Sequence, residues 1–596
     1  DVERSRGLGD VYKRQVGVNK MQTARDLQNQ LRNIDHKSYP AYKGLRGSYQ
    51  FEGYELHIDH VQGDPFAAPS HVRIEVPLRD AKFPEWSTKD NLTKTALADE
   101  LTRQFERQVA HYTFKAKGSG KSGLLSVTRC GQEVLKRTAC EIGEKHLIAR
   151  FSVGFPANGR TINARELEKI LFDYLPACVQ QSFYFKNLSE ERLHKVIALA
   201  EDQEAIRSQL KEKHLVAFVA DGAILPRESG ISSRPMRDSV AFSSPDSLRV
   251  SMELPHKGTI TGMGIPEGIT LIVGGGYHGK STLLQALELG VYNHIAGDGR
   301  EYVITDDTAV KLRAEDGRFI KDADISMFIN DLPNKKDTHR FSTEDASGST
   351  SQAAGIVEAM EAGSHVFLLD EDTSATNFML RDALMQQVVS PDKEPITPFL
   401  SRAGELYEKE GISTILVAGS SGAFFHIADT VIQMDNYVPL DITDKAKTLC
   451  AKFPVEAEKA KPYVRPESVR IMTKDPNGAK PKRVYRTGAV KGTPERLKVK
   501  LLGKDGFALG RQNVDLRYVE QLVDSEQTAA LGMLLKYAVE KMIDGKKTIP
   551  EIVSYLQKQL ETKGLSFFAD GGYIPCGYAI PRVQEIYACF NRYRRA

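Results

Sequence analysis

The chain of 596 residues has no long uncharged apolar run and contains only six cysteines. A helix needs about 20 consecutive apolar residues to cross a bilayer, so the sequence excludes a membrane subunit that carries its own pore. The cysteines lack the short paired spacings that zinc sites and redox dithiols need. An apolar signal segment is also missing, and we therefore expect a cytoplasmic protein with reduced cysteines.

The chain also lacks a large excess of charge of either sign. The 81 basic and 78 acidic residues leave a net charge of only +3, so the global charge gives no argument for nucleic-acid binding. A composition of 41% hydrophobic and 27% charged residues is ordinary for a water-soluble protein. Since single hydrophobic cores stop growing near roughly 250–300 residues, two to four domains are expected.

Patterns along the chain predict three domains after a short tail. Residues 1–20 contain what a common sequencing adapter encodes, so we expect a cloning or assembly scar there and a natural start near Met21. Mixed helix and strand patterns predict an N-terminal α+β domain over 21–245, which ends in a polar, proline-containing loop. Strand–helix alternation predicts a mostly parallel α/β core over 246–440. A basic α+β domain is expected over 441–596.

Local periodicity predicts the individual elements. The predicted helices are Ala24–Ile34, Leu92–His111, Ser189–Lys213, Ser281–Leu289, Gln352–Ala362, Ala403–Glu410, Glu520–Ile543, Thr548–Thr562 and Pro581–Tyr593. The predicted strands are Tyr49–Ile58, His71–Val76, Leu124–Val127, Leu215–Val219, Thr270–Val273, Val366–Leu369, Thr414–Val417 and Thr430–Met434.

The sharpest motif is a glycine-rich loop between an apolar strand and a helical segment. It fits the phosphate-binding pattern known as Walker A, in which glycines let backbone amides turn toward phosphates above a helix N-terminus. Lys280 would add a positive charge for the phosphates, and the Ser281 hydroxyl a ligand for Mg²⁺. The candidate nucleotide-binding residues are Gly274, Gly275, Gly276, Tyr277, His278, Gly279, Lys280, Ser281 and Thr282.

A second glycine-rich segment, Gly118–Gly123, looks similar. It has Lys115 where the first glycine of the pattern should stand, and no apolar strand leads into it. We therefore expect a flexible loop at this position.

An apolar strand that ends in acids lies downstream, at His365–Asp372. Asp370 at the strand end would place its carboxylate in the second coordination shell of Mg²⁺, and Glu371 would polarise an attacking water. A buried strand ending in solvated acids is the plainer interpretation, but the complete phosphate loop upstream favours the catalytic one. The candidate catalytic residues are therefore Glu371 and Lys280, with ATP and Mg²⁺ as cofactors.

A small polar turn, Asp345–Gln352, leads into a helix, and its Ser347 stands 23 positions before Asp370. This order and distance suit an ABC signature loop followed by the acidic strand. Here the chain resembles the "predicted ATPase of the ABC class" family, over nearly everything after Met21. The matching blocks are Gln62–Ser70, Gly154–Arg160, Gly274–Leu284, Asp298–Glu301, Ala314–Arg318, Ser347–Ala354 and Asp370–Asp382.

The resemblance implies an ATP hydrolase that closes as a head-to-tail homodimer around two nucleotides and uses hydrolysis to drive a conformational change. It implies that Lys280 and Ser281 contact phosphates and Mg²⁺, that Asp370 binds Mg²⁺ and that Glu371 is the base. The signature residues implied to meet the γ-phosphate of the opposite subunit are Ser347, Gly348 and Ser349. The implied D-loop consists of Ser374, Ala375, Thr376 and Asn377.

Two departures from transporter ATPases stand out. The segment Leu416–Ser421 has serine where those enzymes carry a histidine, and His426 comes later within a helical pattern. Phosphate sensing by histidine is therefore in doubt. A Q-loop glutamine cannot be assigned between Lys280 and Ser347, where the available polar residues are Asp306, Asp324 and Asn330.

Basic residues far outnumber acids between Lys445 and Lys504. A solvated face or linker is one interpretation, and a track for a nucleic-acid backbone is the other. Tyr463, Tyr485 and Phe507 interleave with the positive charges, as stacking on single strands requires. Three hypotheses stay open: a dimeric ATPase acting on some partner, an RNA or single-stranded nucleic-acid-binding module clamped by ATP, and a nucleotide-dependent scaffold with negligible turnover.

Overall fold

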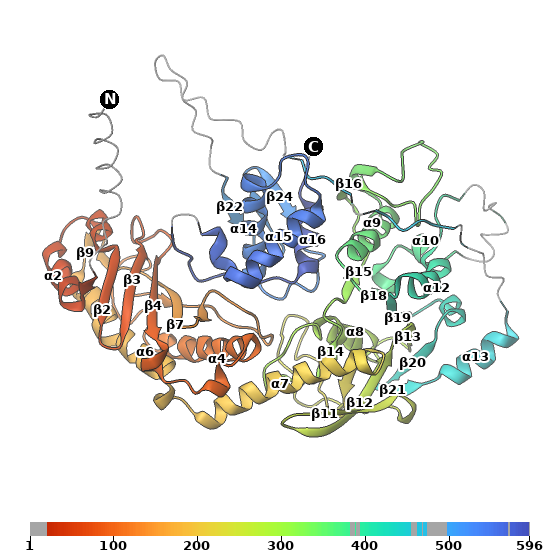
Figure 1. Ribbon diagram of the computed structural model, residues 1–596, viewed down its shortest axis with the longest axis horizontal. Coiled ribbons are helices and arrows are strands. Elements are labelled where there is room, and N and C mark those ends of the chain that lie inside the picture. Colours follow the sequence, from red (N-terminus) through yellow and green to blue (C-terminus); the bar gives the residue numbers. More distant parts are fainter. Residues whose placement is uncertain are drawn as a thin grey trace, which may run out of the picture. The chain divides into compact units, whose positions relative to one another are not determined.

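The computed structural model describes residues 21–381, 388, 394–454, 460, 462–467, 469–473, 497–569 and 572–594 (Figure 1). The predicted tail 1–20 and about half of the basic stretch Lys445–Lys504 lie outside these ranges. The chain forms two compact units, one made of Asp1–Lys89, Glu100–Arg129 and Thr138–Glu190, the other of Asp90–Asp99, Cys130–Arg137 and Glu191–Ala596. Within the described ranges, no helix combines the length and apolar character that crossing a membrane takes.

The first unit is built on a seven-stranded sheet in the order β1-β2-β3-β4-β7-β5, with β6 also paired to β7. Its strands are β1 Gln22–Thr23, β2 Gly47–Phe51, β3 Tyr54–His60, β4 Ser70–Pro77, β5 Leu125–Ser126, β6 Cys140–Ile142 and β7 His146–Val153, beside a small hairpin of β8 Ala157–Asn158 and β9 Thr161–Ile162. Burial alternates strictly along β4, so one face of this sheet is apolar and the other polar.

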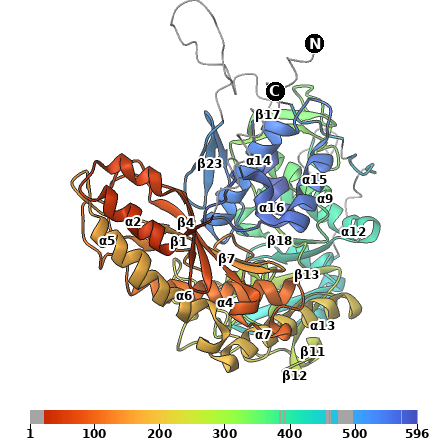
Figure 2. The same cartoon turned by 60° about the vertical axis from the view of Figure 1, so that its left-hand side comes forward.

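Helices cover the apolar face. They are α2 Ala24–Ile34, α3 Leu78–Ala81, the part of α4 Asn91–Ala110 that begins at Glu100, α5 Ala164–Glu168 and α6 Leu175–Phe183, with short turns η1 Tyr39–Leu45, η2 Glu85–Ser87, η3 Lys169–Tyr174 and η4 Phe185–Asn187. Phe105 of α4 packs edge-on against Phe151 of β7, with ring centroids 5.4 Å apart, and lies 4.9 Å from Phe183 of α6. Both ribbon views show α4 and α6 against the sheet (Figures 1 and 2).

Two predictions in this unit are corrected. The expected strand Tyr49–Ile58 is a hairpin of β2 and β3, because Gly53 turns the chain with φ of 80°. The segment Gly118–Gly123, expected to be a flexible loop, is held by hydrogen bonds instead. Lys121 N donates to Pro65 O over 2.8 Å, and a Cβ on Gly154 would lie only 1.8 Å from the Lys121 carbonyl oxygen.

The second unit contains the remaining elements. Its strands are β10 Leu215–Ala220, β11 Arg249–Leu254, β12 Gly258–Pro266, β13 Ile269–Val273, β14 Val303–Thr305, β15 Val310–Leu312, β16 Arg318–Ala323, β17 Phe341–Ala346, β18 Val366–Asp370, β19 Ser413–Val417, β20 Thr430–Asp435, β21 Val438–Asp441, β22 Val499–Leu501, β23 Gly506–Leu509 and β24 Gln512–Asp515. Its helices are α7 Glu190–Glu212, α8 Lys280–Leu289, α9 Gly348–Glu361, α10 Thr376–Met379, α12 Phe399–Glu410, α13 Thr443–Lys452, α14 Ser525–Lys541, α15 Ile549–Lys563 and α16 Val583–Arg592, with the turns η5 Asp246–Leu248, η6 Glu371–Thr373, η8 Gly422–His426 and η9 Gly564–Phe568.

The centre of this unit is a six-stranded sheet in the order β15-β18-β19-β13-β20-β21. All its pairings are parallel except that of β20 with β21. Ile272 of β13 belongs to a core cluster with residues of α8, whereas the neighbouring Leu271 belongs to a second cluster with residues of α9 and α12. Helices thus bury both faces, as a parallel sheet requires. The predicted α/β class with a mostly parallel central sheet is confirmed.

A four-stranded antiparallel sheet, β11-β12-β10-β14, lies before the phosphate loop in sequence. Ala217 of β10 pairs with Ile265 on one side and Thr305 on the other. A domain boundary near residue 245 would separate β10 from both of these partners. The loop that suggested a domain boundary therefore connects β10 with strands of the same sheet.

The C-terminal part combines the sheet β22-β23-β24 with α14, α15 and α16. The helix predicted from Glu520 begins later, at Ser525, because Asp524 caps it. The Asp524 side chain accepts from the first turn, and Gln527 reaches back to the Asp524 backbone, which forms a capping box.

Candidate nucleotide-binding site

Three strands bring the predicted site residues to one edge of the six-stranded sheet. Asp370, the last residue of β18, pairs with Val417 of β19, and Val417 pairs with Ile272 of β13. The carboxyl ends of these parallel strands therefore lie side by side (Figure 1). The glycine-rich loop that follows β13 and the Glu371 that follows β18 both start from this edge.

The loop between β13 and α8 needs glycine at two positions. Gly274 has φ of 143° and Gly279 has φ of 98°. A Cβ on Gly274 would lie 2.4 Å from the Met434 carbonyl oxygen, and one on Gly279 would lie 2.7 Å from the Tyr437 ring. Tyr277 also adopts a left-handed backbone, with φ of 65°, and its side chain is fully exposed. The loop is thus a tight and specific structure rather than a chance run of glycines.

Lys280 is the first residue of α8, and its amino group lies across the loop. The Nζ atom donates to the carbonyl oxygens of Gly274, over 2.7 Å, and Gly275, over 2.8 Å. Phosphate oxygens can replace these two acceptors, since they offer a stronger charge-assisted bond. Ser281 is exposed in the first turn of the same helix, as a ligand for a phosphate-bound Mg²⁺ must be. These residues fit Mg-ATP.

The turn between β20 and β21, which the sequence did not connect with the site, forms hydrogen bonds with the glycine-rich loop. Between β20 and β21, the Asn436 amide donates to His278 Nδ1 over 2.9 Å, and the Tyr437 amide donates to the His278 carbonyl over 3.0 Å. Asn436 and Tyr437 both have positive φ values, of 48° and 67°. The sequence contains this Asn-Tyr pair, but no local pattern indicates that it contacts a loop about 160 residues earlier in the chain.

Glu371 is held by the loop after β19. Its carboxylate accepts from the Gly419 amide over 2.7 Å, from the Ser420 amide over 3.0 Å and from the Ser420 hydroxyl over 2.6 Å. Burial alone raises the pKa of Glu371, but these hydrogen bonds outweigh it and leave the pKa below its ordinary value. Ser420 thus contacts the candidate base, and His426 is placed at the end of η8.

Asp370 differs from its neighbour. Its side chain is 8% exposed, and it accepts from the Asp372 amide over 3.2 Å. Burial raises the pKa of the Asp370 carboxyl, although the bond from Asp372 acts in the opposite direction. A buried acid of this kind gains most from a nearby cation, which is the role expected for Asp370 beside Mg²⁺.

The signature turn leads directly into α9. Ser347 is the N-cap residue, and its exposed hydroxyl accepts from the Thr350 amide over 3.4 Å. Gly348 has little room, because an added Cβ would lie 3.3 Å from Ala314 Cβ. An exposed helix N-terminus of this form suits an anion supplied from outside the turn.

The predicted D-loop is tied to the same helix. The Ser349 hydroxyl donates to Asn377 Oδ1 over 2.7 Å. Gln352 is fully buried, and its side chain donates to Ser374 Oγ over 3.0 Å and accepts from the Ala375 amide over 2.9 Å. Ser349, implied to meet a partner's phosphate, is thus 6% exposed and engaged within its own subunit.

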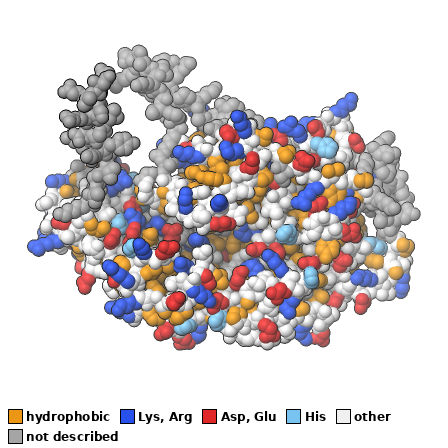
Figure 3. All heavy atoms as spheres, viewed as in Figure 1, with side chains coloured by type: hydrophobic (Ala, Val, Ile, Leu, Met, Phe, Trp, Pro, Cys, Tyr) orange, Lys and Arg blue, Asp and Glu red, His pale blue; other side chains and the backbone are white. Residues whose placement is uncertain are grey.

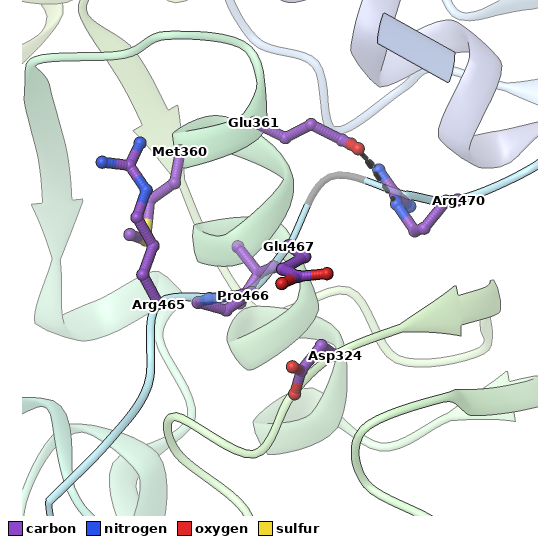
Figure 4. A pocket seen from close by; sticks show the side chains of 8 residues that line it. Asp324, Met360, Glu361, Arg465, Pro466, Glu467 and Arg470 are labelled. Atoms are coloured by element: carbon purple, nitrogen blue, oxygen red, sulfur yellow. Dashed lines mark hydrogen bonds and ion pairs between the residues drawn. The ribbon is translucent and has the colours of Figure 1, made fainter. Parts of the chain in front are cut away.

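The far end of α9 is clamped by a later segment. Arg470 forms an ion pair with Glu361, and its guanidinium lies 3.6 Å from Glu358, which also pairs with Arg318. Figure 4 shows Arg470 reaching Glu361 across a small pocket, and Asp324 also lines it. The clamp fixes the helix whose other end is the signature turn.

The three polar residues available for a Q-loop each form a hydrogen bond with a residue close to them in sequence. Asp306 accepts from the Thr308 amide over 2.8 Å, and Asp324 accepts from the Ser326 amide over 3.0 Å. Asn330 donates to the Ser326 carbonyl over 2.6 Å. Each stabilises its own turn, so none is marked as a nucleotide contact.

The aromatic part of the nucleic-acid interpretation is wrong for one residue. Phe507 is fully buried in the C-terminal core, so it cannot stack on a base. The Tyr463 hydroxyl donates to Glu410 over 3.0 Å. Tyr485 and the basic residues of 474–496 lie outside the described ranges. Basic and acidic side chains intermingle on the face shown in Figure 3, and nucleic-acid binding stays a prediction.

A glycine-rich loop after a central parallel strand, beside an acidic strand end, defines a P-loop nucleotide-binding protein. Three family descriptions match the chain: ATPase of the ABC class N-terminal over residues 24–186, the P-loop domain of the ABC ATPases over 189–469, and MRB1590 C-terminal domain over 498–596. The chain belongs to the ABC-class ATPases, and its P-loop domain implies ATP binding.

One curated relative is the uncharacterized protein MJ1628 of Methanocaldococcus jannaschii, which is 31% identical over 255 residues. The match covers 41% of this chain and 55% of that protein, so the chain spans about half the length of this relative.

Solved structures similar to 40% of this chain include an ATP-binding cassette of an ABC transporter and a part of the ABC transporter complex cbiONQ. The ADP conformation of the ATP-binding cassette MJ1267 is 11% identical, with 95% of that chain covered and a TM-score of 0.25. The corresponding values for cbiO1 from Clostridium perfringens are 14%, 92% and 0.25.

Proposed function

We propose that this protein hydrolyses ATP at the sheet edge that carries Lys280 and Glu371. The observation that supports this most is the register of β13, β19 and β18, which starts the phosphate loop and the acidic residues from one edge. Lys280 and the loop amides bind the phosphates, and Ser281 with Asp370 holds Mg²⁺. When bound, Mg²⁺ neutralises charge that develops on the phosphates.

Glu371 acts as the base in this proposal. Its pKa lies below the ordinary value, so the carboxylate is ionised at neutral pH and able to accept a proton from water. The bonds from Gly419 and Ser420 orient it. Ser420 therefore positions the base from the place where transporter ATPases carry a histidine.

We further propose that two copies close head to tail in the cytoplasm. The signature turn ends in an exposed helix N-terminus at Ser347, which has no phosphate of its own to bind and suits one held by a partner. Closure would move α9 together with the D-loop, since Gln352 links them. This movement would act on whatever molecule the dimer binds.

The direct test compares Mg-ATP binding and hydrolysis in three variants. Lys280→Ala should weaken binding by roughly ten- to a hundredfold, because charge-assisted bonds to phosphate contribute about 1.5–3 kcal/mol. Glu371→Gln should keep binding and lose nearly all hydrolysis. Lys409→Ala, which removes an exposed lysine from α12, is the matched control and should change neither.

Calorimetry and phosphate release give the two readouts. Wild-type affinity in Lys280→Ala would contradict the phosphate-loop assignment. Full turnover in Glu371→Gln would contradict the base, and tight binding without any wild-type turnover would leave a nucleotide-dependent scaffold.

A further inference from the structure

The polar face of the sheet in the first unit carries an unusual group of side chains. Glu55 on β3 and Glu75 on β4 are direct partners in the antiparallel register, and His57 is two residues along from Glu55 on the same face. The His57 Nε2 atom lies 3.4 Å from a Glu55 oxygen and 3.7 Å from a Glu75 oxygen. One ligand atom from each of the three residues falls within 4.8 Å of the others.

His57 points an unsatisfied nitrogen at the two acids. The residue is 6% exposed, and its Nε2 atom is buried without a hydrogen-bond partner in the described part of the chain. Its other nitrogen, Nδ1, lies 2.7 Å from the Ser48 hydroxyl on β2. If Nδ1 carries the proton and donates it to Ser48, the lone pair of Nε2 faces Glu55 and Glu75, an arrangement seen when the other ring nitrogen orients a metal-bound histidine.

Glu55 and Glu75 face each other directly in the register of β3 and β4, and like charges directly opposite each other destabilise a strand pair. Arg73 pairs with Glu75 and with Asp59, the latter over 2.9 Å. Arg46 and Arg150 also act on the Asp59 carboxyl, and Arg150, opposite Arg73 in the register, pairs with Glu141. A divalent cation bound by both Glu55 and Glu75 would relieve the repulsion between these two facing acids.

We propose that Glu55, His57 and Glu75 bind a divalent transition-metal ion of the zinc class. The ligands are Nε2 of His57 and one oxygen from each glutamate, a set of one nitrogen and two oxygens that suits Zn²⁺. The Glu75 oxygen nearest His57, Oε1, is also the oxygen that pairs with Arg73. Because each carboxylate oxygen has two lone pairs, Glu75 can bind Arg73 and the metal ion together. Mg²⁺ and Ca²⁺ prefer oxygen ligands alone, and this site is therefore separate in chemistry from the Mg-ATP site.

Three protein ligands leave a position open on a tetrahedral ion, for water or for an oxygen, nitrogen or sulfur atom of a further ligand. The site lies wholly within the first unit and uses no residue of the phosphate loop. Its existence therefore does not depend on the proposed ATP hydrolysis.

The test uses the full chain, stripped with a chelator and with its cysteines alkylated, and titrates it with Zn²⁺. Glu55→Gln removes a proposed ligand, whereas Asp59→Asn removes one negative charge from the same face without removing a ligand. We expect one Zn²⁺ per chain in the wild type, an affinity at least tenfold weaker in Glu55→Gln, and less than a threefold change in Asp59→Asn. Absorption spectroscopy at the zinc edge should find nitrogen and oxygen ligands at about 2.0–2.2 Å.

Thermal unfolding supplies a second readout. Saturating Zn²⁺ should raise the melting temperature of the wild type and of Asp59→Asn but not that of Glu55→Gln, since only ligands that bind the folded state stabilise it. Equal zinc affinity in Glu55→Gln and the wild type would overturn the proposal. So would equal weakening in Glu55→Gln and Asp59→Asn, which indicates diffuse attraction to negative charge. If Glu55→Gln does not fold, His57→Gln replaces it with the same expected loss.

Discussion

Ser420 stands where transporter ATPases carry a histidine, and it holds the candidate base. Its hydroxyl bonds to Glu371 over 2.6 Å and contributes to lowering the pKa of that carboxyl. Removing the hydroxyl in Ser420→Ala should therefore raise the pKa of Glu371. The acidic limb of the pH profile of kcat should move to higher pH, and kcat should fall by roughly tenfold, the loss expected for about 1.4 kcal/mol of charge-assisted bonding.

Two variants make this prediction specific. Ser420→Thr keeps a hydroxyl and should restore the profile. Ser421→Ala removes the next hydroxyl along, which accepts from the Ala423 amide over 3.3 Å, and should leave the acidic limb in place. ATP affinity should stay at the wild-type level in all three, and an unmoved acidic limb in Ser420→Ala would show that Ser420 does not tune the base.

At the scale of elements, the helix that follows the phosphate loop ends in a buried acid that faces the C-terminal part. Glu288 of α8 lies 3.9 Å from Lys311 of β15. The Gln521 side chain, which comes just before α14, donates to the Glu288 carbonyl over 3.0 Å and to the Ala309 carbonyl over 3.1 Å. These contacts connect α8 with the C-terminal part of the second unit.

This buried acid makes stability depend on pH. Burial raises the pKa of Glu288 from 4.5 to about 7, with Lys311 acting in the opposite direction. Because the folded state holds this proton more tightly than the unfolded state, the stability contributed is complete below the unfolded pKa and is lost as pH rises through 7. The shift corresponds to at most about 3 kcal/mol.

Glu288→Gln should therefore lose less stability than the wild type between pH 5 and pH 8, as measured by urea unfolding. Glu561→Gln, which changes an exposed acid on α15, is the control and should follow the wild-type curve. Parallel curves for Glu288→Gln and the wild type would mean that Glu288 stays ionised in the folded protein.

At the scale of the whole molecule, a composite site predicts complementation between two defective chains. Ser347→Arg should block hydrolysis by placing bulk and charge at the exposed signature turn, while its own ATP binding stays intact. Ser349 is a poorer choice, since it is buried and bonded to Asn377. In a mixture with Lys280→Ala, each mixed dimer has one site with both lesions and one with neither.

Equal mixing should restore about a quarter of the wild-type rate if an intact site fires alone, because half of the dimers are mixed and each has one intact site of two. Glu371→Gln should in addition become dimeric in Mg-ATP, as measured by light scattering. Normal hydrolysis by Ser347→Arg, together with a monomeric Glu371→Gln, would leave a P-loop ATPase that works without a composite site.

Much of the fold could be predicted from the sequence because its signals are local. The helix Ala24–Ile34 was predicted with both of its ends from its amphipathic pattern, and in the structure Thr23 and Asp26 form a capping box at its start. The phosphate loop could also be predicted, because its glycines, its lysine and the flanking strand and helix form one continuous segment. The hairpin at Gly53 was missed, since a long alternating pattern hides a two-residue turn.

The sequence by itself determined the class of this protein, the α/β core and the chemical types at the phosphate loop and the acidic strand. Only the tertiary structure decided that Ser420 touches Glu371, that Phe507 is buried and that His57 lies close to both Glu55 and Glu75. Motifs and caps depend on residues a few positions apart, whereas these contacts depend on strand register and on burial. Register and burial are set by packing between distant segments, and one chain read alone contains no local signal for them.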